Sequence, residues 1–365
     1  MVPGGVDRSG THRVIPHLVE FIAALARRHD VRVIALRQEP EPGGWMLGGA
    51  EVRNIGARPR RLRALALLSK EHRRRPFDLL HGFALVPQGA LVALAGRLLG
   101  VPRVVEAPGG EFADLADIGF GGWRRAPGRF WVRVACRGAA ACVVGSEHAL
   151  RLAQARGVGA IRLPLPLSPD VWPAQPPRPR TGLARLAWIG SLNQVKDPAL
   201  LLDAALALRE RRLDFRLDVV GEDFLGGAVH RRARALGLDS LVTFHGFLTQ
   251  GALREVLGRA TLLLVTSRFD AGPRVVLEAA SLGVPTVGTA VGYVDEWSPD
   301  GARAVAVRTP EALADAVIAV LGDEESRQAL GRNALVRLKE HDCEHVVSRW
   351  EAVYRQAAGR GVDRD

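Results

Sequence analysis

The sequence has few cysteines, few lysines and no long apolar run, and each shortage excludes a class of protein. Its three cysteines, Cys136, Cys142 and Cys343, have neither the paired spacing of a zinc site nor the density of a disulfide scaffold. No segment reaches the roughly 18–20 consecutive apolar residues of a membrane span, and the N-terminus lacks the charged-then-apolar order of a secretory signal. We therefore expect a cytoplasmic protein with reduced thiols.

Lysine is replaced by arginine almost everywhere. Only Lys70, Lys196 and Lys339 occur among the 50 basic residues, while the formal net charge is +11. This bias is typical of a GC-rich genome, and the sequence contains no recognisable element that reads nucleic acid. We expect no nucleic-acid partner, but an anionic membrane surface or a phosphorylated ligand stays compatible with the charge.

Strand-like and helix-like segments alternate along the 365 residues, which are enough for two domains. This alternation predicts an α/β fold with parallel sheets. A proline-rich stretch without periodicity interrupts it within residues 163–182. The predicted strands are 31–36, 78–81, 103–106, 141–144, 186–189, 216–220, 242–245, 262–266 and 286–288, and the predicted helices include 17–28, 89–99, 146–155 and 344–357.

Two Rossmann-like domains follow from this pattern. We expect an N-terminal acceptor-side domain over residues 1–165, a linker over 166–182 and a nucleotide-sugar-binding domain over 183–340. A C-terminal helical segment, 341–365, is expected either to stand apart or to return to the N-terminal domain.

The chain opens directly on a glycine-rich turn, MVPGGVDRSG, whereas such turns normally follow a first strand. Either the gene model omits the first strand or the sheet begins one strand short. Gly4 and Gly5 are candidate cleft residues near a donor, and a plain turn is the alternative.

A first candidate site is the loop GSLNQVKDP, which directly follows the predicted strand ending at Ile189. Gly190 lets a ligand approach the backbone, the amides of the following helix start favour an anion, and Lys196 adds a positive charge. The loop therefore predicts a diphosphate site that also includes Ser191 and Asn193. An ordinary strand-to-helix loop with an exposed lysine is the alternative.

A second candidate site is the run DAGPRVVLE, in which seven residues separate Asp270 from Glu278. Pro273 is suited to the first helical position, so the amides near Gly272, Arg274 and Val275 would face an anion. A loop acid can accept hydrogen bonds from sugar hydroxyls, and a helix acid can bind a ribose diol. The alternative is a helix cap followed by a solvated glutamate.

These two motifs together resemble family 4 of the retaining glycosyltransferases, also called glycosyl transferases group 1. SRFDAGPRVVLEAASLGVPTVG looks like the family's acid signature, and GSLNQVKD matches its phosphate loop at the expected distance upstream. The likeness is strong over residues 183–357 and diffuse over 1–165. It implies the GT-B fold, in which two Rossmann-like domains face a central cleft.

The resemblance also implies roles. Lys196 would neutralise the leaving diphosphate, Asp270 would contact the donor sugar and Glu278 would bind the ribose. The implied reaction moves a hexose-type sugar from a UDP-, GDP- or ADP-sugar to a glycan, lipid-linked or small-molecule acceptor, with retention and without a metal or other cofactor. The chain departs from the family pattern at three places: Ser191 stands where arginine is common, Asp270 where glutamate is usual, and Pro108 near a frequent histidine.

The N-terminal half offers weaker acceptor-side candidates. Gly110 and Glu111 lie in a loop that would face the cleft, and Glu111 could orient or deprotonate an acceptor hydroxyl. His81 ends a predicted strand, where a histidine is as often a structural hydrogen-bonding residue.

A basic stripe follows in RAPGRFWVRVACR, where arginines recur every four residues beside Phe130 and Trp131. On a helix they would suit anionic lipid headgroups at the inner membrane face, and a solvated face is the alternative. The four arginines are Arg125, Arg129, Arg133 and Arg137.

Other functions stay open at this stage. A glycoside hydrolase would need two carboxylates flanking one bond and no phosphate loop. A GT-B sugar-nucleotide epimerase and a catalytically impaired nucleotide-sugar-binding homologue fit the motifs more closely. The sequence identifies neither the base, the sugar, the acceptor nor the oligomeric state.

Overall fold

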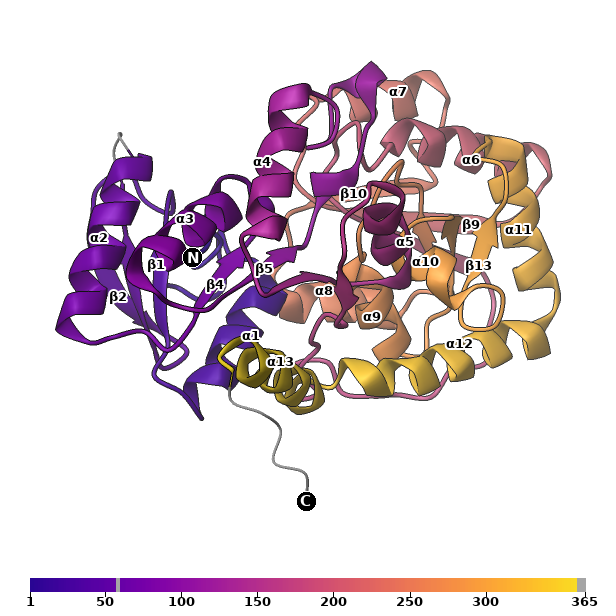
Figure 1. Ribbon diagram of the computed structural model, residues 1–365. Helices are drawn as coiled ribbons and strands as arrows, with labels where there is room; N and C mark the ends of the chain where they lie inside the picture. Colours follow the sequence, from indigo (N-terminus) through magenta and orange to yellow (C-terminus); the bar gives the residue numbers. More distant parts are fainter. Residues whose placement is uncertain (57–59, 360–365) are drawn as a thin grey trace. The chain divides into compact units, whose positions relative to one another are not determined.

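The computed structural model describes residues 1–56 and 60–359. The chain divides into two compact units: residues 1–166 with the C-terminal residues from Asp342 on, and residues 167–341 (Figure 1). Each unit has its own hydrophobic core. Among the helices of the described residues, none combines the length and apolar character required to cross a bilayer.

The second unit is built on a six-stranded parallel sheet in the order β10-β9-β8-β11-β12-β13. The strands are β8 (Ala184–Ile189), β9 (Phe215–Val220), β10 (Val242–Gly246), β11 (Leu262–Val265), β12 (Thr286–Thr289) and β13 (Arg303–Val305). This order runs outward from β8 in one direction and from β11 in the other, as in dinucleotide-binding folds. The predicted parallel α/β architecture is therefore confirmed.

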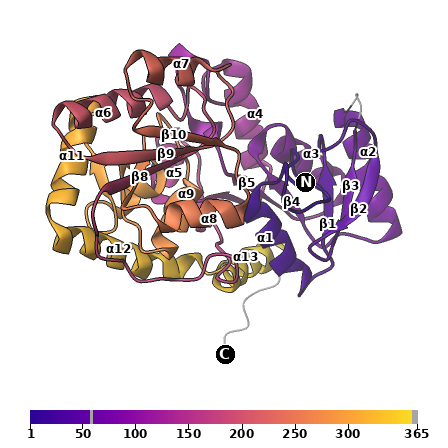
Figure 2. The ribbon, with the colours of Figure 1, turned by 180° about the vertical axis from the view of Figure 1, so that it is seen from behind.

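Helices cover this sheet because its strands are apolar on both faces. All four residues of β11 are buried, as expected for a central parallel strand. Helices α6 and α11 pack against each other over the sheet (Figure 2). The helices are α6 (Pro198–Glu210), α7 (Ala228–Ala235), α8 (Gln250–Gly258), α9 (Arg274–Ser281), α10 (Gly292–Trp297), α11 (Pro310–Gly322), α12 (Glu324–Leu338) and the 3-10 turn η4 (Lys339–His341).

The proline-rich segment expected as a linker packs against the second unit. Trp172 is 1% exposed, and the Gln175 amide donates to the Ser281 carbonyl at 2.7 Å. The segment is therefore a fixed part of this unit's surface.

The first unit contains two sheets that meet at the N-terminus. One has the order β1-β3-β2 with an antiparallel β2–β3 pair, and the other is parallel with the order β4-β5-β6-β7. The strands are β1 (Arg32–Ala35), β2 (Gly43–Leu47), β3 (Ala50–Asn54), β4 (Leu80–Phe83), β5 (Arg103–Ala107), β6 (Ala141–Val144) and β7 (Ile161–Arg162). Met1 and Val2 lie between β1 and β4, with Val2 bridging Ala35 in parallel.

The helices of the first unit include one from the far end of the chain. Helix α13 packs against α1, and the Trp350 and Phe21 ring centroids lie 5.4 Å apart (Figure 1). The helices are α1 (Pro16–Ala26), α2 (Arg60–Arg74), η1 (Leu85–Gly89), α3 (Ala90–Leu99), η2 (Gly110–Phe112), η3 (Ala116–Ile118), α4 (Ala126–Arg137), α5 (Glu147–Ala155) and α13 (Cys343–Ala357). The Ser146 hydroxyl caps α5 by accepting from the Ala149 amide at 3.1 Å.

Candidate functional site

The two predicted motifs lie at the point where the strand order of the second sheet reverses. Strands β8 and β11 are parallel neighbours, so their carboxyl ends share one edge of the sheet. The loop with Gly190 and Lys196 follows β8, and the loop with Asp270 follows β11. Ligands of open α/β sheets bind at this reversal, which brings the two motifs together.

Buried hydrogen bonds hold the lysine loop on the neighbouring strand. The Trp188 indole donates to the Thr266 hydroxyl at 2.9 Å, and that hydroxyl donates to the Lys196 carbonyl at 2.8 Å. Thr266 is fully buried. Asn193 shapes the loop from within, because its Oδ1 accepts from the Val195 and Lys196 amides, each at 3.0 Å. No sequence motif indicates Thr266, because its role depends on the pairing of β8 with β11.

Asp197 ends the lysine loop as the cap of α6. Its carboxylate accepts from the Leu200 amide at 3.1 Å and pairs with the Arg308 guanidinium. Its φ of 48° lies in the left-handed region, where aspartate is tolerated better than most residues. No motif in the sequence indicates the ion pair, and Arg308 is 111 residues away from Asp197.

Lys196 and Asp270 form an ion pair across the two loops. The lysine side chain is 29% exposed and that of Asp270 15% exposed, so both keep part of their surface in contact with solvent. Asp270 also accepts a long hydrogen bond of 3.4 Å from the Gly272 amide. An anion that approaches Lys196 would therefore compete with a carboxylate that is already in place.

Glu278 is buried, whereas the alternative sequence interpretation made it a solvated glutamate. Its residue exposure is 6%, and its Oε1 accepts from the Arg274 Nε at 2.9 Å within α9. Pro273 is the cap residue rather than the first helical residue, so Arg274 and Val275 occupy the first turn of α9. Amides of a first helical turn point out of the helix and favour an anion.

The glycines at the start of the chain form a tight turn in the first unit. Gly5 has a φ of +76°, and a Cβ there would clash with the Ile15 side chain. The Ile15 amide donates to the Gly5 carbonyl, and the Val6 amide donates to the Gln38 side chain, both at 2.9 Å. These contacts account for Gly5 structurally. A Cβ on Gly4 would lie 3.1 Å from the Arg37 carbonyl oxygen.

Glu111 lies in the short η2 turn of the first unit. Its Oε2 accepts from the Gly109 amide at 2.8 Å, and burial raises the pKa of its carboxyl to about 7. A carboxyl with such a pKa can exchange a proton near neutral pH. The Phe120 ring occupies the space that a side chain on Gly110 would need.

His81 lies inside β4, and its side chain contacts α13 and the neighbouring strand β5. Its Nδ1 is 2.9 Å from the Tyr354 hydroxyl, its Nε2 is 3.5 Å from Glu106, and its ring centroid is 4.7 Å from that of Trp350. Burial lowers the pKa of the imidazole. This environment favours the structural role that the sequence analysis left open.

Metal-ligating side chains do not gather anywhere in the part of the chain that the structure describes: no group of three or more His, Cys, Asp or Glu residues could hold an ion. Cys136, Cys142 and Cys343 are free thiols.

Two family models match the chain in tandem. The glycosyl transferase 4-like domain matches residues 9–168, and glycosyl transferases group 1 matches residues 175–337. The chain belongs to the group 1 glycosyltransferases. The resemblance stated from the two motifs is thereby confirmed.

Curated relatives of this glycosyltransferase match over part of their length. The glycogen synthase of Mycobacterium tuberculosis is 32% identical over 193 residues, 52% of this chain and 46% of the relative. A D-inositol 3-phosphate glycosyltransferase of Kribbella flavida is 28% identical over 183 residues, 47% of this chain and 43% of the relative. The aligned region thus spans a little under half of each relative.

Solved structures match nearly the whole chain and confirm the GT-B fold. The sucrose-phosphate synthase from Thermosynechococcus elongatus has a TM-score of 0.81 at 16% identity, covering 99% of this chain and 98% of that chain. Anabaena HepE in complex with UDP and glucose has a TM-score of 0.73 at 15% identity, covering 96% of this chain and 97% of that chain.

Proposed function

We propose that this group 1 glycosyltransferase moves a hexose-type sugar from a nucleoside-diphosphate sugar to a glycan, lipid-linked or small-molecule acceptor. The observation that carries the proposal is the Lys196–Asp270 ion pair at the reversal of the second sheet. A UDP-, GDP- or ADP-sugar is the donor class, and the UDP bound by the related HepE structure supports it. We propose a place in polysaccharide or cell-envelope synthesis, and the glycogen synthase among the relatives supports the polysaccharide.

The proposed reaction develops negative charge on the leaving diphosphate. Lys196 would exchange Asp270 for a phosphate oxygen as this charge develops, which stabilises the transition state more than the ground state. The first-turn amides of Arg274 and Val275, with Gly190, Ser191 and Asn193 opposite, would complete the anion site. Asp270, once released, would accept a hydrogen bond from a sugar hydroxyl.

Glu278 would bind the ribose diol with its carboxylate, which the Arg274 guanidinium holds in place within α9. The reaction is proposed to retain anomeric configuration and to use no metal, because Lys196 and the amides supply the stabilising charge. Assigning the anomer of the product by NMR tests retention. Activity that is lost on treatment with a chelator would contradict the metal-independent reaction.

Lys196→Ala tests the function directly. We expect nucleoside diphosphate release to fall about 100- to 1,000-fold, as when one transition-state donor is removed. Lys339→Ala, which replaces another lysine of the same unit at an exposed position, should retain activity. UDP-, GDP- and ADP-sugars are first screened for thermal stabilisation and then assayed with candidate acceptors.

Two alternatives predict other outcomes of the same assay. A nucleotide-sugar-binding homologue without activity would be stabilised by a donor and release no diphosphate with any acceptor. A GT-B epimerase would convert the donor to its epimer and form no transfer product. Either outcome would overturn the proposed transfer.

We also propose that α4 docks the enzyme on an anionic membrane, near a lipid-linked acceptor. Phe130 and Trp131 are 58% and 42% exposed, and their ring centroids lie 5.2 Å apart. Exposed aromatic side chains next to arginines suit a headgroup layer, where rings insert and guanidinium groups bind phosphate. The arginines near these rings are Arg125 at the N-cap of α4 and Arg129, Arg133 and Arg137 within the helix.

Vesicle flotation tests the docking surface. Replacing these four arginines by glutamine should weaken binding to phosphatidylglycerol vesicles about 100-fold or more, since each contributes about 1 kcal/mol near an anionic surface. The matched control replaces four exposed arginines of α2, a helix whose sequence contains no Phe, Tyr or Trp. Equal loss in both variants, or no salt-sensitive binding of the parent, would contradict the proposal. The control arginines are Arg61, Arg63, Arg73 and Arg74.

A further inference from the structure

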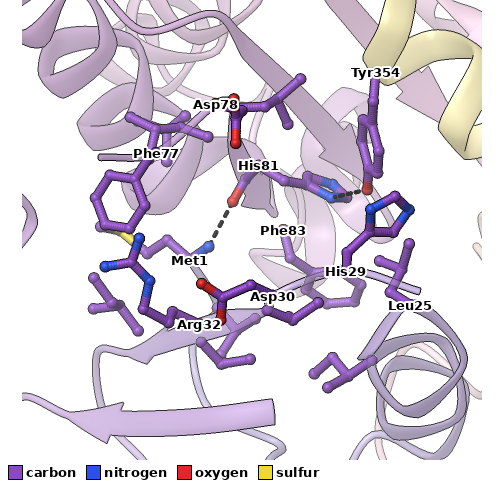
Figure 3. Close-up of a pocket in the computed structure, with 18 of the residues that line it drawn as sticks. Met1, Leu25, His29, Asp30, Arg32, Phe77, Asp78, His81, Phe83 and Tyr354 are labelled. Atoms are coloured by element: carbon purple, nitrogen blue, oxygen red, sulfur yellow. Dashed lines mark hydrogen bonds between the residues drawn. The ribbon is translucent and has the colours of Figure 1, made fainter. Parts of the chain in front are cut away.

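The first unit contains a pocket of about 390 Å³ between β1 and β4. Figure 3 shows the side chains around it, among them Met1, Asp30, His81 and Tyr354. The Arg32 guanidinium lies over the Phe77 ring, 4.1 Å from its centroid. Every residue that lines it belongs to the first unit. The proposed sugar-transfer site of the second unit makes no use of this pocket.

Backbone groups at one end of the pocket already follow the pattern of a strand. The Val2 amide donates to the Ile34 carbonyl at 2.9 Å, and the Leu36 amide donates to the Val2 carbonyl at 3.1 Å. On the opposite side, the Phe83 amide donates to the Met1 carbonyl at 2.9 Å. Successive residues thus bond to β1 and then to β4, as in an interior strand of a parallel sheet.

The sheet edges continue beyond this contact. Strand β1 is an edge strand of the sheet β1-β3-β2, and β4 is an edge strand of the sheet β4-β5-β6-β7. Within the described residues, Val2–Ala35 is the bridge assigned to this edge of β1. Residues 30–34 and 76–81 extend along the pocket beyond it. Edges of this kind present rows of amides and carbonyls that can pair with an inserted strand.

The walls of the pocket determine which side chains such a strand would carry. Leu18 and Ile22 of α1 line one face of the pocket, while Leu68 of α2 and Val92 of α3 line the other. These residues belong to two different core clusters, one on each face of the strands. A strand in the pocket would therefore have apolar side chains on both faces, the pattern of a central parallel strand.

The amine of Met1 points to where the strand would enter. It donates to the His81 carbonyl at 2.5 Å, and burial lowers its pKa to about 5. A peptide amide at this position would donate the same hydrogen bond without a charge to desolvate.

We propose that the pocket is the seat of a parallel β-strand of about five consecutive apolar residues that joins the chain at the nitrogen of Met1. The strand pairs with β1 on one side and β4 on the other. It unites the two sheets of the first unit in the order β2-β3-β1-strand-β4-β5-β6-β7. Its side chains fill the space between α1 on one face and α2 and α3 on the other.

An N-terminal extension of the chain tests this proposal and needs no substrate. One variant has five valine and leucine residues fused before Met1, and the matched control has five glycine and serine residues. The apolar extension should raise the thermal midpoint by about 4 °C or more, because it adds buried area and paired backbone. The control extension should leave the midpoint within about 1 °C of the parent.

Hydrogen exchange provides a second readout that does not depend on the thermal transition. With the apolar extension, amide exchange in residues 30–36 and 78–83 should slow by about tenfold or more, while exchange in the second unit is unchanged. The proposal is overturned if both extensions act alike, or if the apolar one changes neither readout. The same five apolar residues are also added as a separate peptide. The proposal is overturned if this peptide protects these segments and the fused extension does not, because the occupant then binds as a separate molecule.

Discussion

At the scale of single residues, the sequence indicates which side chains supply the chemistry of the site better than it indicates which of them form ion pairs. Lys196 and Asp270 are recognisable because a rare lysine and a strand-end acid stand in linked motifs. Their ion pair depends on β8 and β11 being neighbours, which no local spacing indicates. The Arg274–Glu278 pair has helical i, i+4 spacing and could have been predicted. Burial of Glu278 comes from tertiary packing.

Glu278→Gln separates a ribose-binding role from a structural one. The amide keeps the size of the side chain and an oxygen that accepts from the Arg274 Nε, so we expect a change in the thermal midpoint of less than about 3 °C. Loss of the charged acceptor should raise the KM for the donor about tenfold, since hydrogen bonds to charged groups contribute about 1.5–3 kcal/mol.

Steady-state kinetics with the donor as the varied substrate measure this effect. Glu278→Ala is the less informative variant because it leaves the Arg274 guanidinium, 11% exposed, without this carboxylate. An unchanged KM in the glutamine variant, together with a large fall in the thermal midpoint, would assign Glu278 to stability alone.

At the scale of secondary-structure elements, α13 is a C-terminal helix whose stability depends on the N-terminal unit. Trp350 is 3% exposed and packs on Phe21 and His81. We expect Trp350→Ala to lower the free energy of unfolding by about 3–5 kcal/mol, the usual loss for a buried large aromatic residue. Tyr354→Phe removes one hydrogen bond to His81 and should cost about 0.5–1.5 kcal/mol.

Urea unfolding measures both losses. It is followed by far-UV circular dichroism, a backbone signal that the loss of a tryptophan leaves usable. Arg355→Ala, at an exposed position on the same helix, is the matched control and should stay within about 0.5 kcal/mol of the parent. Equal stabilities of the parent and Trp350→Ala would show that α13 contributes nothing to the core of the first unit.

The bounds of strands with strong apolar patterns are predicted to within a residue or two. The polar elements β2, β3 and α2 are not predicted. Strands β6 and β11 are apolar runs, and both predictions lie within one residue of the observed bounds. The β2–β3 hairpin has an exposed, glycine-rich first strand, and α2 is dominated by arginine, so neither stands out from a loop. The strand predicted at 78–81 lies two residues later, because the buried run continues to Phe83.

At the scale of the whole molecule, α/β alternation predicts two parallel-sheet units but not the strand order. The order of the second sheet depends on which strands pair over tens of residues, and only this order creates the reversal at which the candidate site lies. The opening glycine turn led to two expectations about a first strand. The structure adds Met1–Val2 bonding to β1 and β4, which sequence patterns could not indicate.

The stability of the molecule should depend on pH through two partly buried groups, Glu111 and the Met1 amine, whose pKa values shift in opposite directions. Burial raises the pKa of Glu111 from 4.5 to about 7, so the folded state holds a proton that the unfolded state releases. This contribution is present below pH 4.5 and is lost as the pH rises through about 7. Burial lowers the pKa of the Met1 amine from 8.0 to about 5, so its contribution is present above pH 8 and lost as the pH falls through about 5.

Glu111→Gln isolates the first of these contributions. The Met1 amine and His81, whose pKa burial also lowers, act alike in parent and variant and cancel in the difference. The lowered pKa of Glu324, about 2, acts below this window. The free energy of unfolding of the parent relative to the variant should therefore fall steadily between pH 4.5 and 7 and be constant above it. Urea titrations across this range measure the difference, and a gap independent of pH would show that Glu111 ionises in the folded protein as it does in the unfolded chain.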